Sequence, residues 1–241
     1  MKFKKPCVNY LEFRPSKIWD DQFKHLLLLL YWPVFGILFA FVEKGYDRYL
    51  PALGKQFHYV HCTLDDIIPF NEFFVIPYLF WFLYIVLSLA YTLLYDLDSY
   101  KRTMTFIIIT YTVAILCYFT YPTAQNLRPV VFERDNILTQ FMQKFYAFDT
   151  NTNVCPSIHV CGSFASTFAF TQSKGVSKGV KISAHIINVL ICLSTVFLKQ
   201  HSAIDVIVAL PICAAAYFFC YRCNVKTAKQ SSKKRISATN V

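Results

Sequence analysis

The sequence predicts an all-α membrane protein, a single polytopic bundle of six transmembrane helices. Apolar residues make up 56% of the 241 residues and charged residues only 16%, whereas about 25% charged is usual in soluble proteins. The charges also cluster between long apolar runs instead of marking one face of each helix. Because lipid offers no hydrogen bonds, each span must satisfy its own backbone amides, and we expect every span to be an α-helix.

Six stretches are candidate spans. A run of about 17 residues rises about 26 Å as a helix, which suits a hydrocarbon core of roughly 30 Å. One candidate, Pro156–Gln172, is more polar than the rest because it contains Ser, Thr and His. The first run has no small-residue cleavage pattern, so we interpret it as a retained span. The five strongly apolar runs are Leu26–Val42, Phe73–Tyr95, Met104–Tyr121, Ile182–Leu198 and Ile204–Tyr221.

The positions of the basic residues predict the orientation of the bundle. Seventeen of the 24 Lys and Arg residues fall in the two tails and in the loops that would share their side, and seven fall on the other side. Because cytoplasmic loops are enriched in positive charge, we expect a multi-pass cell-membrane protein with both termini in the cytoplasm. The net charge of +10 is therefore mainly a topology signal, and we expect no nucleic-acid partner.

The expected organisation is one membrane domain with two short flanking segments. Residues 1–25 form a cytoplasmic N-terminal segment, residues 26–221 the six-helix domain, and residues 222–241 a basic cytoplasmic tail that lies along the membrane surface. Most of the nine cysteines lie in or beside apolar runs, where Cys behaves as a small hydrophobe. Cys62 and Cys155 are both expected outside, and the sequence leaves their pairing open. His58, His61 and Asp65 have the side-chain types of metal ligands, but we interpret their segment as interfacial.

Three ionisable residues lie at the mouths of two predicted spans, where charge is costly and usually functional. His159 opens the fourth span, and His201 and Asp205 lie at the start of the sixth. The expected topology places all three, together with Arg128 of the loop before the fourth span, on the extracytoplasmic side. A structural polar cluster that pins helices together is the alternative, but interhelical hydrogen bonds are worth only about 0.6 kcal/mol on average. We therefore interpret the group as a catalytic site.

The spacing of these residues indicates phosphoryl transfer without a metal or cofactor. His201 and Asp205 are four residues apart, so on a helix they share a face, and the carboxylate can orient the imidazole. A second histidine, His159, can supply a proton to a leaving group. Arg128 offers two parallel donors to phosphate oxygens, and Ser157 with the backbone amides that open the fourth helix can donate to the same anion.

At these residues the chain resembles the type 2 phosphatidic acid phosphatase superfamily. Members of that family share a Lys…Arg-Pro block, a Pro-Ser-Gly-His block and a Ser-Arg…His…Asp block. The chain has Arg128-Pro129 for the first, Pro156-Ser157-Ile158-His159 for the second, and Ser194-Thr195 followed by His201 and Asp205 for the third. The resemblance runs from about residue 65 to residue 221 and includes the six-helix layout of the family.

The chain departs from the family pattern at three positions. Tyr121 stands where the first block has Lys, Thr195 where the third has Arg, and Ile158 where the second has Gly. Lys199 is a candidate replacement for one missing cation. Within the superfamily the chain is most similar to the branch of inositol phosphorylceramide and sphingomyelin synthases, on the motifs Tyr121-Pro122-Thr123, Pro156-Ser157-Ile158-His159 and Lys199-Gln200-His201.

The resemblance implies a role for each site residue. His201 would be the nucleophile and form a phosphohistidine, Asp205 would orient it, and His159 would protonate the leaving alkoxide. Arg128, Ser157 and Lys199 would hold the phosphate oxygens. The expected function is a lipid phosphate phosphatase whose partners are its substrate and the surrounding membrane lipids. Transfer of a phospho-headgroup to an alcohol and a catalytically inactive lipid-binding or transport protein stay open as alternatives, as does assembly into a homo-oligomer.

Overall fold

The structure, a computed structural model, describes residues 5–51, 54 and 56–223, and only the backbone for residues 46–48. The part of the basic tail beyond residue 223 lies outside the described residues. It contains the basic side chains Lys226, Lys229, Lys233, Lys234 and Arg235.

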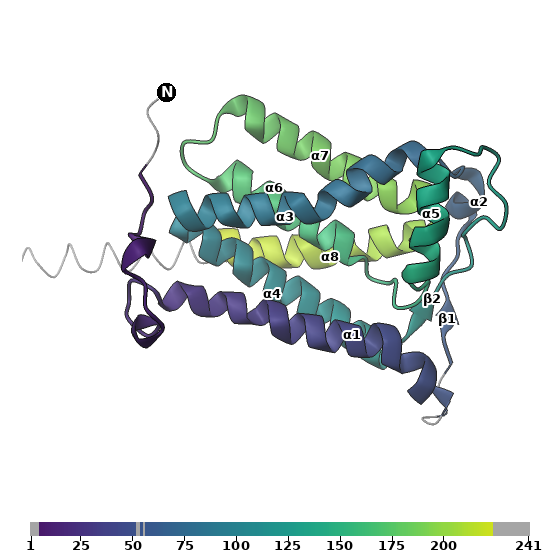
Figure 1. The fold of residues 1–241 in the computed structure, drawn as a ribbon, viewed down its shortest axis with the longest axis horizontal. Helices are drawn as coiled ribbons and strands as arrows, with labels where there is room; N and C mark the ends of the chain where they lie inside the picture. The colour runs from purple at the N-terminus through teal and green to yellow at the C-terminus, as the bar shows by residue number, and fades with distance from the viewer. Residues whose placement is uncertain (1–4, 52–53, 55, 224–241) are drawn as a thin grey trace, which may run out of the picture.

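Six helices run side by side along the long axis of the molecule (Figure 1). The first is extended by a preceding 3₁₀ helix, η3 (Lys24–Leu30), and the last continues into a π-helical segment, η6 (Phe218–Cys223). The six helices are α1 (Tyr31–Tyr49), α3 (Val75–Tyr95), α4 (Leu97–Thr120), α6 (Ile158–Gln172), α7 (Lys178–Phe197) and α8 (Ala203–Tyr217).

Within the described residues, five helices are long and apolar enough to cross a membrane. The all-α class predicted from the sequence is thus confirmed, and the only strands in the part of the chain described are β1 (His58–Tyr59) and β2 (Thr123–Ala124). The remaining bundle helix, α6, has 15 residues; α8 has the same length but is continued by η6, whereas α6 has no such extension. The five long segments are Lys24–Gly45, Glu72–Tyr95, Leu97–Thr120, Lys178–Phe197 and Ala203–Cys223.

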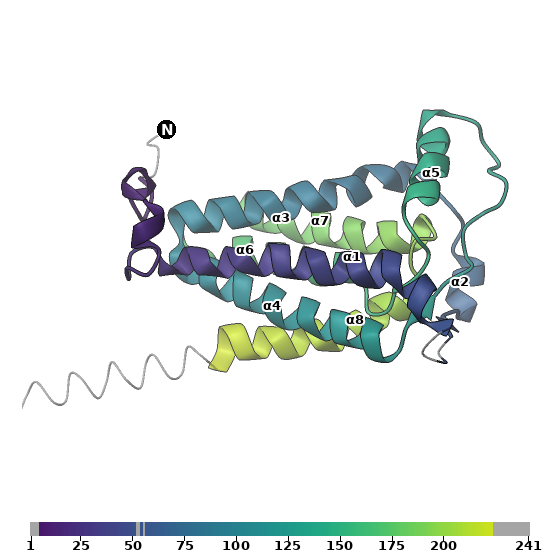
Figure 2. The same ribbon diagram turned by 60° about the horizontal axis from the view of Figure 1, so that its bottom comes forward.

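The two ends of the bundle differ. At one end, here called the α5 end, lie helix α5 (Ile137–Phe148), which runs across the bundle, the short helix α2 (Thr63–Ile67) and the two short parallel strands (Figures 1 and 2). A 3₁₀ turn, η5 (Glu72–Phe74), leads from this end into α3. At the opposite end lie the 3₁₀ turns η1 (Tyr10–Glu12) and η2 (Pro15–Lys17).

Two segments predicted as loops are helical. The Asp96–Arg102 segment belongs mostly to α4, which begins at Leu97 because the Asp96 carboxylate accepts a hydrogen bond from the Ser99 amide (3.1 Å). The 122–155 segment contains α5, which begins after Asn136 because its side chain accepts from the amides of Leu138 (2.9 Å) and Thr139 (3.1 Å). Both starts are N-caps of the usual kind.

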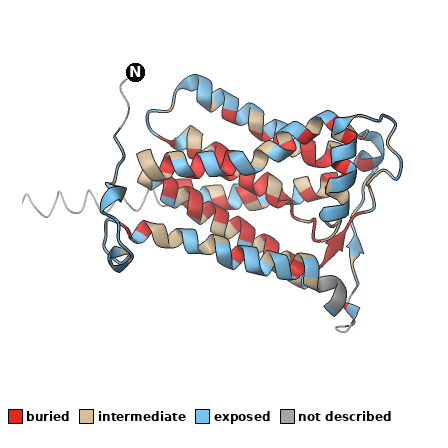
Figure 3. Cartoon of the chain, viewed as in Figure 1, coloured by how far each residue is buried: buried red, intermediate tan, exposed pale blue. Residues whose placement is uncertain are grey.

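The centre of the bundle is formed by α6 and α4, which carry many of the buried residues (Figure 3). α6 contributes small side chains such as Gly162, Ala165 and Ala169, and these let neighbouring helices approach closely. The outward faces of the long helices instead expose large apolar side chains, among them Phe82 on α3 and Ile182 on α7. Such faces suit a bundle whose solvent is lipid.

Candidate functional site

The turn between α7 and α8 presents the central histidine. The Thr195 carbonyl accepts hydrogen bonds from the amides of both Gln200 and His201 (3.0 Å each), and Lys199 adopts a left-handed backbone (φ 52°). Ser202 then caps α8: its hydroxyl accepts from the Ile204 amide (3.2 Å). The turn is therefore tightly fixed on both sides of His201.

His159, His201 and Asp205 form a continuous chain, although His201 lies in the turn before α8 and not on the helix face that its spacing from Asp205 predicts. Nδ1 of His201 lies 3.1 Å from Oδ2 of Asp205, which also accepts from the Ser202 amide (3.0 Å). Nε2 of His201 lies 3.3 Å from Nδ1 of His159. Asp205 is fully buried and His201 nearly so. A buried carboxylate in this position fixes the orientation and the tautomer of the imidazole.

His159 is held in place by aromatic rings and by the start of α6. Its ring stacks on Tyr78 (centroids 4.6 Å apart) and lies tilted against Trp81 (4.3 Å). The Tyr118 hydroxyl donates to the carbonyl of Pro156 (2.7 Å), and the Ser157 amide donates to the Asp205 carbonyl (3.2 Å). These contacts tie the N-termini of α6 and α8 together, so the two histidines face each other.

Both histidines line a pocket of about 360 Å³ at the α5 end. Its walls come from α1, α3, α4, α6, the turn before α8 and the segment after α5. Two carboxylates, Glu43 and Asp149, share the pocket with the histidines. The other lining residues are Phe39, Tyr78, Tyr118, Thr150, Thr152, Asn153, Val154, Ile158 and Gln200.

Arg128 contacts protein groups behind the pocket instead of lining it. Its guanidinium donates to the carbonyls of Tyr146 (3.1 Å), Asp149 (2.8 Å) and Thr150 (2.6 Å) and to Oε1 of Gln200 (2.6 Å). It also lies 4.6 Å from the centroid of the Tyr146 ring. The expected phosphate clamp is therefore occupied by the C-terminal end of α5 and the residues after it. Arg128 reaches the pocket only through three lining residues, Asp149, Thr150 and Gln200.

Lys199 and Ser157 also lie outside the set of pocket-lining residues. The Lys199 ammonium donates to the carbonyls of Asp65 (2.7 Å) and Ile68, groups at the end of α2 that the helix itself does not satisfy. Burial lowers the pKa of Lys199, although Asp65 and Asp66 act in the opposite direction. Ser157 is fully buried, and its hydroxyl has no partner among the described residues. The structure thus gathers His159, His201 and Asp205 around one pocket but does not place the three expected phosphate ligands in its lining.

Asp65 is a site residue that the sequence did not indicate. Its carboxylate accepts hydrogen bonds from the Ser202 hydroxyl (2.5 Å) and from the amides of Ala203 (2.8 Å) and Cys62 (2.8 Å). Burial would raise the pKa of Asp65, but these hydrogen bonds together hold it below its ordinary value. Its neighbour Asp66 is instead exposed and pairs with His61 (2.8 Å). Within the described residues no group of three or more His, Cys, Asp or Glu is arranged to hold a metal.

Glu43 and Asp149 are likewise new to the site. The Glu43 carboxylate accepts from the hydroxyl and amide of Thr150, which joins α1 to the segment after α5. Burial raises the pKa of Asp149, and the charges of Arg128 and His201 reduce that shift. Both residues are far from the histidines in sequence, so only the fold could reveal them.

Cys62 and Cys155, whose pairing the sequence left open, are free thiols in the structure. Burial and the nearby Asp205 carboxylate raise the pKa of Cys155 to about 12. The thiol is therefore protonated at neutral pH and is a poor nucleophile.

No family model, curated protein or solved structure matches this chain. What the structure establishes, in the part of the chain it describes, is a helical bundle with five helices apolar enough to cross a membrane. A pocket at one end is lined by two facing histidines, one of which contacts a buried aspartate.

Proposed function

We propose that the protein is a membrane enzyme that cleaves the phosphoester of a lipid phosphate through a phosphohistidine on His201. The observation that carries the proposal is the chain His159–His201–Asp205, whose two imidazoles open into one pocket. An imidazole held by a carboxylate on Nδ1 has its Nε2 lone pair free for attack. A second imidazole beside that atom can serve as the acid and base.

The reaction takes place in two displacements. In the first, Nε2 of His201 forms a bond to phosphorus while the bond from phosphorus to the lipid oxygen breaks, and protonated His159 gives its proton to that oxygen. In the second, His159 takes a proton from water, whose oxygen attacks phosphorus and breaks the bond to Nε2. Asp205 stabilises the positive charge on His201 in each step. Neither step requires a metal or cofactor.

The proposed enzyme has six spans, with α6 as the fourth and both termini in the cytoplasm. α6 rises only about 22 Å, but its N-terminus lies under the segment that follows α5, so its polar start is covered by protein. The excess of basic residues on the side of the termini supports this orientation. The pocket then faces the extracytoplasmic side of the cell membrane, at the depth of lipid headgroups.

Headgroup transfer to an alcohol is the second candidate, and the charges of the pocket favour it. Two carboxylates, Glu43 and Asp149, line the pocket, whereas Arg128 and Lys199 are bound to protein carbonyls. A phosphate monoester carries nearly two negative charges and would be repelled by such a site. A zwitterionic phosphodiester carries one negative charge and a cation that the carboxylates attract. The same histidines would then transfer the headgroup to an alcohol instead of water.

The test compares the wild type with His201→Ala, and uses His185→Ala on the exposed face of α7 as the matched control. Phosphate release is measured from phosphatidic acid and from an isoprenyl diphosphate in mixed micelles that contain EDTA. We expect release by the wild type and the control but not by His201→Ala. If none of the three proteins releases phosphate, phosphatidylethanolamine with a diacylglycerol acceptor tests transfer. Failure of both assays would leave a non-enzymatic lipid-binding role.

A further inference from the structure

Helix α1 packs against α4 and leaves a gap on the side that faces α3. Tyr31 of α1 contacts the Thr112 hydroxyl (3.0 Å), and Phe35 lies against Tyr111 (centroids 4.8 Å apart), with both partners on α4. Two hollows lie between α1 and α3. One is the histidine pocket, which includes Phe39 and Glu43 of α1 and Tyr78 of α3. The other lies further from the α5 end.

The second hollow is an apolar groove of about 770 Å³. Trp32 of α1 forms one wall, and Ile85, Leu89 and Ala90 of α3 form the other. Tyr100 of α4 lies at its far end. Almost the whole surface of the groove is hydrocarbon or aromatic, so a polar ligand has nothing to bind there, whereas an aliphatic chain does.

Gly162, one turn after His159 on α6, packs between a residue that lines the groove and a residue that packs on His159. A Cβ atom at Gly162 would lie 2.8 Å from Ile85 of the groove and 2.8 Å from Nε1 of Trp81, the ring that packs on His159. The hydroxyl of Tyr111, which is 1% exposed, lies at the same point. Neither that hydroxyl nor the Trp81 nitrogen has a hydrogen-bond partner among the described residues.

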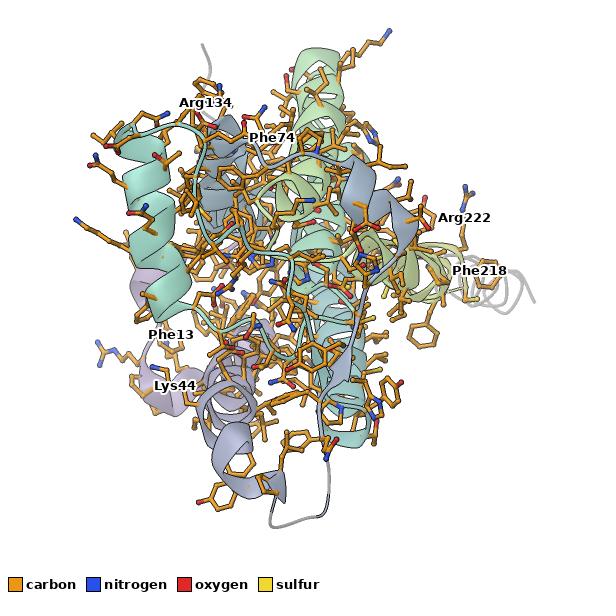
Figure 4. All side chains as sticks on the ribbon, turned by 90° about the vertical axis from the view of Figure 1, so that its right-hand side faces the viewer. Phe13, Lys44, Phe74, Arg134, Phe218 and Arg222 are labelled. Carbon is orange, nitrogen blue, oxygen red and sulfur yellow. The ribbon has the colours of Figure 1, made fainter. Side chains whose placement is uncertain are left out.

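Helix α5 covers the α5 end of the gap between α1 and α3. Near its start Asn136 donates to Glu72, which leads into α3 (2.9 Å), and after its end Thr150 donates to Glu43 of α1. Viewed from that end, α5 extends from the side of Phe74 to the side of Lys44 (Figure 4). The gap is therefore closed by α5 at the α5 end, next to the histidines. Further from that end it is bordered by exposed apolar side chains, which face lipid in the proposed orientation.

We infer that the groove between α1 and α3 holds the hydrocarbon chain of the substrate, which enters sideways from the membrane. The inference rests on the proposed function, since that function places the phosphate at His201. From Tyr78 in the pocket to Ala90 in the groove, α3 rises about 18 Å. That length is close to the share of one leaflet, about 15 Å, in the hydrocarbon core. The unpaired donors of Trp81 and Tyr111 lie between headgroup and chain, where an ester or amide carbonyl would accept from them.

The test fills the groove with Ala90→Phe and uses Ala215→Phe, an exposed alanine on α8, as the matched control. The ratio of kcat/KM for dioleoyl over dihexanoyl phosphatidic acid is measured for each protein. We expect the ratio to fall at least about tenfold in Ala90→Phe, since the lost burial of two methylene groups suffices for that. The control should keep the wild-type ratio. Equal ratios in all three proteins would overturn the inference that the groove holds the hydrocarbon chain, while leaving the proposed function intact.

A binding measurement separates the groove from the reaction. His201→Ala is labelled in micelles with a phosphatidic acid that carries a diazirine in its acyl chain, and the labelled residues are mapped by mass spectrometry. We expect labels on Trp32 and on the 85–90 stretch of α3 that excess phosphatidic acid removes and excess diacylglycerol does not. If these labels appear but the wild type shows no turnover, the groove still binds the hydrocarbon chain and the proposed function is refuted. Uniform labelling of all outward faces, unaffected by competitor, would overturn the groove whether or not the wild type is active.

Discussion

Asp65 and Asp205 both accept hydrogen bonds from the turn that opens α8, but only Asp205 touches a histidine. Asp65 acts on the backbone: it fixes Ser202 and Ala203, which follow His201 directly. Removing its charge would leave two amides and a hydroxyl with a weaker acceptor in a buried place. Hydrogen bonds to charged groups contribute about 1.5–3 kcal/mol each, so this carboxylate is central to the geometry of the site.

We predict that Asp65→Asn lowers the free energy of unfolding by about 2 kcal/mol at neutral pH. The pKa of Asp65 is lowered in the folded protein, so its stabilisation is present above the unfolded pKa, about 3.9, and is lost as the pH falls through the folded pKa. The difference in Tm between wild type and variant should therefore be constant above about pH 5 and shrink in more acidic solution.

Asp66→Asn is the control, because it makes the same change at the next, exposed residue. It should leave the free energy of unfolding within about 0.5 kcal/mol of the wild-type value. If the two variants behave alike, the carboxylate of Asp65 does not hold the turn.

The sequence identified His159, His201 and Asp205 but not the residues that surround them. The four-residue spacing predicted that His201 and Asp205 pair on one helix face, whereas in the structure His201 lies in the turn before α8 and pairs with Asp205 across the cap residue Ser202. The partners of Lys199 and Arg128 are backbone carbonyls of α2 and of the end of α5, and a sequence motif does not show such groups. Both cations were expected to bind phosphate because only their charge, not their surroundings, was visible.

Arg128→Lys tests whether this residue is structural, as its contacts indicate. Lysine keeps the charge but cannot donate to four acceptors in a plane, so we expect a loss of about 3 kcal/mol in unfolding free energy with a matching loss of activity. Thermal unfolding in detergent measures the first effect. Arg134→Lys, at a partly exposed ion pair with Glu72 (3.0 Å), should cost less than about 1 kcal/mol. A stable Arg128→Lys variant with raised KM would instead indicate contact with the substrate.

At the scale of elements, the apolar runs predicted the long helices because burial in lipid leaves a strong compositional signal. Helix α5 was missed since it is a short amphipathic segment inside a polar stretch, and its cap at Asn136 resembles any turn signal. The predicted span begins at Met104, later than the start of α4 at Leu97. In the sequence the charges of Lys101 and Arg102 indicate a preceding loop, although an exposed helical end tolerates charge. The sequence also did not show that α6 lies at the centre of the bundle, because its small and hydroxyl-bearing residues give it the composition of a weakly hydrophobic span.

Gly162 tests the packing of α6. A Cβ there would lie 2.5 Å from the Tyr111 hydroxyl and 2.8 Å from Ile85 and Trp81, so Gly162→Ala should destabilise by about 1–3 kcal/mol and displace the ring that holds His159. Gly36→Ala on α1 is the control: a Cβ at Gly36 meets nothing within 4 Å, and alanine favours a helix by about 1 kcal/mol. Gly162→Ala should therefore lower Tm, whereas Gly36→Ala should raise it. A neutral Gly162→Ala would show that α6 packs less closely.

At the scale of the whole molecule, the candidate site lies at the α5 end, whereas the N-terminal turns and the α6–α7 connection lie at the other (Figure 1). The proposed function depends on this polarity, because a phosphate must remain wet while its chain stays in lipid. Whether the two ends lie on opposite sides of a membrane depends on α6. It connects the α5 end with the α6–α7 connection, and it has only 15 residues with no helical extension such as η6 gives α8.

We predict that α6 crosses the membrane, so that the loop at residue 134 and the turn at residue 175 lie on opposite sides. A short protease site inserted at each position, one per variant, reports this in sealed vesicles of known orientation. With the cytoplasmic face inside, protease should cut the site at 134 and spare the site at 175, and inverted vesicles should give the reverse. Cleavage of both after detergent treatment confirms that each site is accessible. If both are cut from the same side of sealed vesicles, α6 does not span, and the proposed six-span topology fails while the histidine chemistry could still be assayed independently.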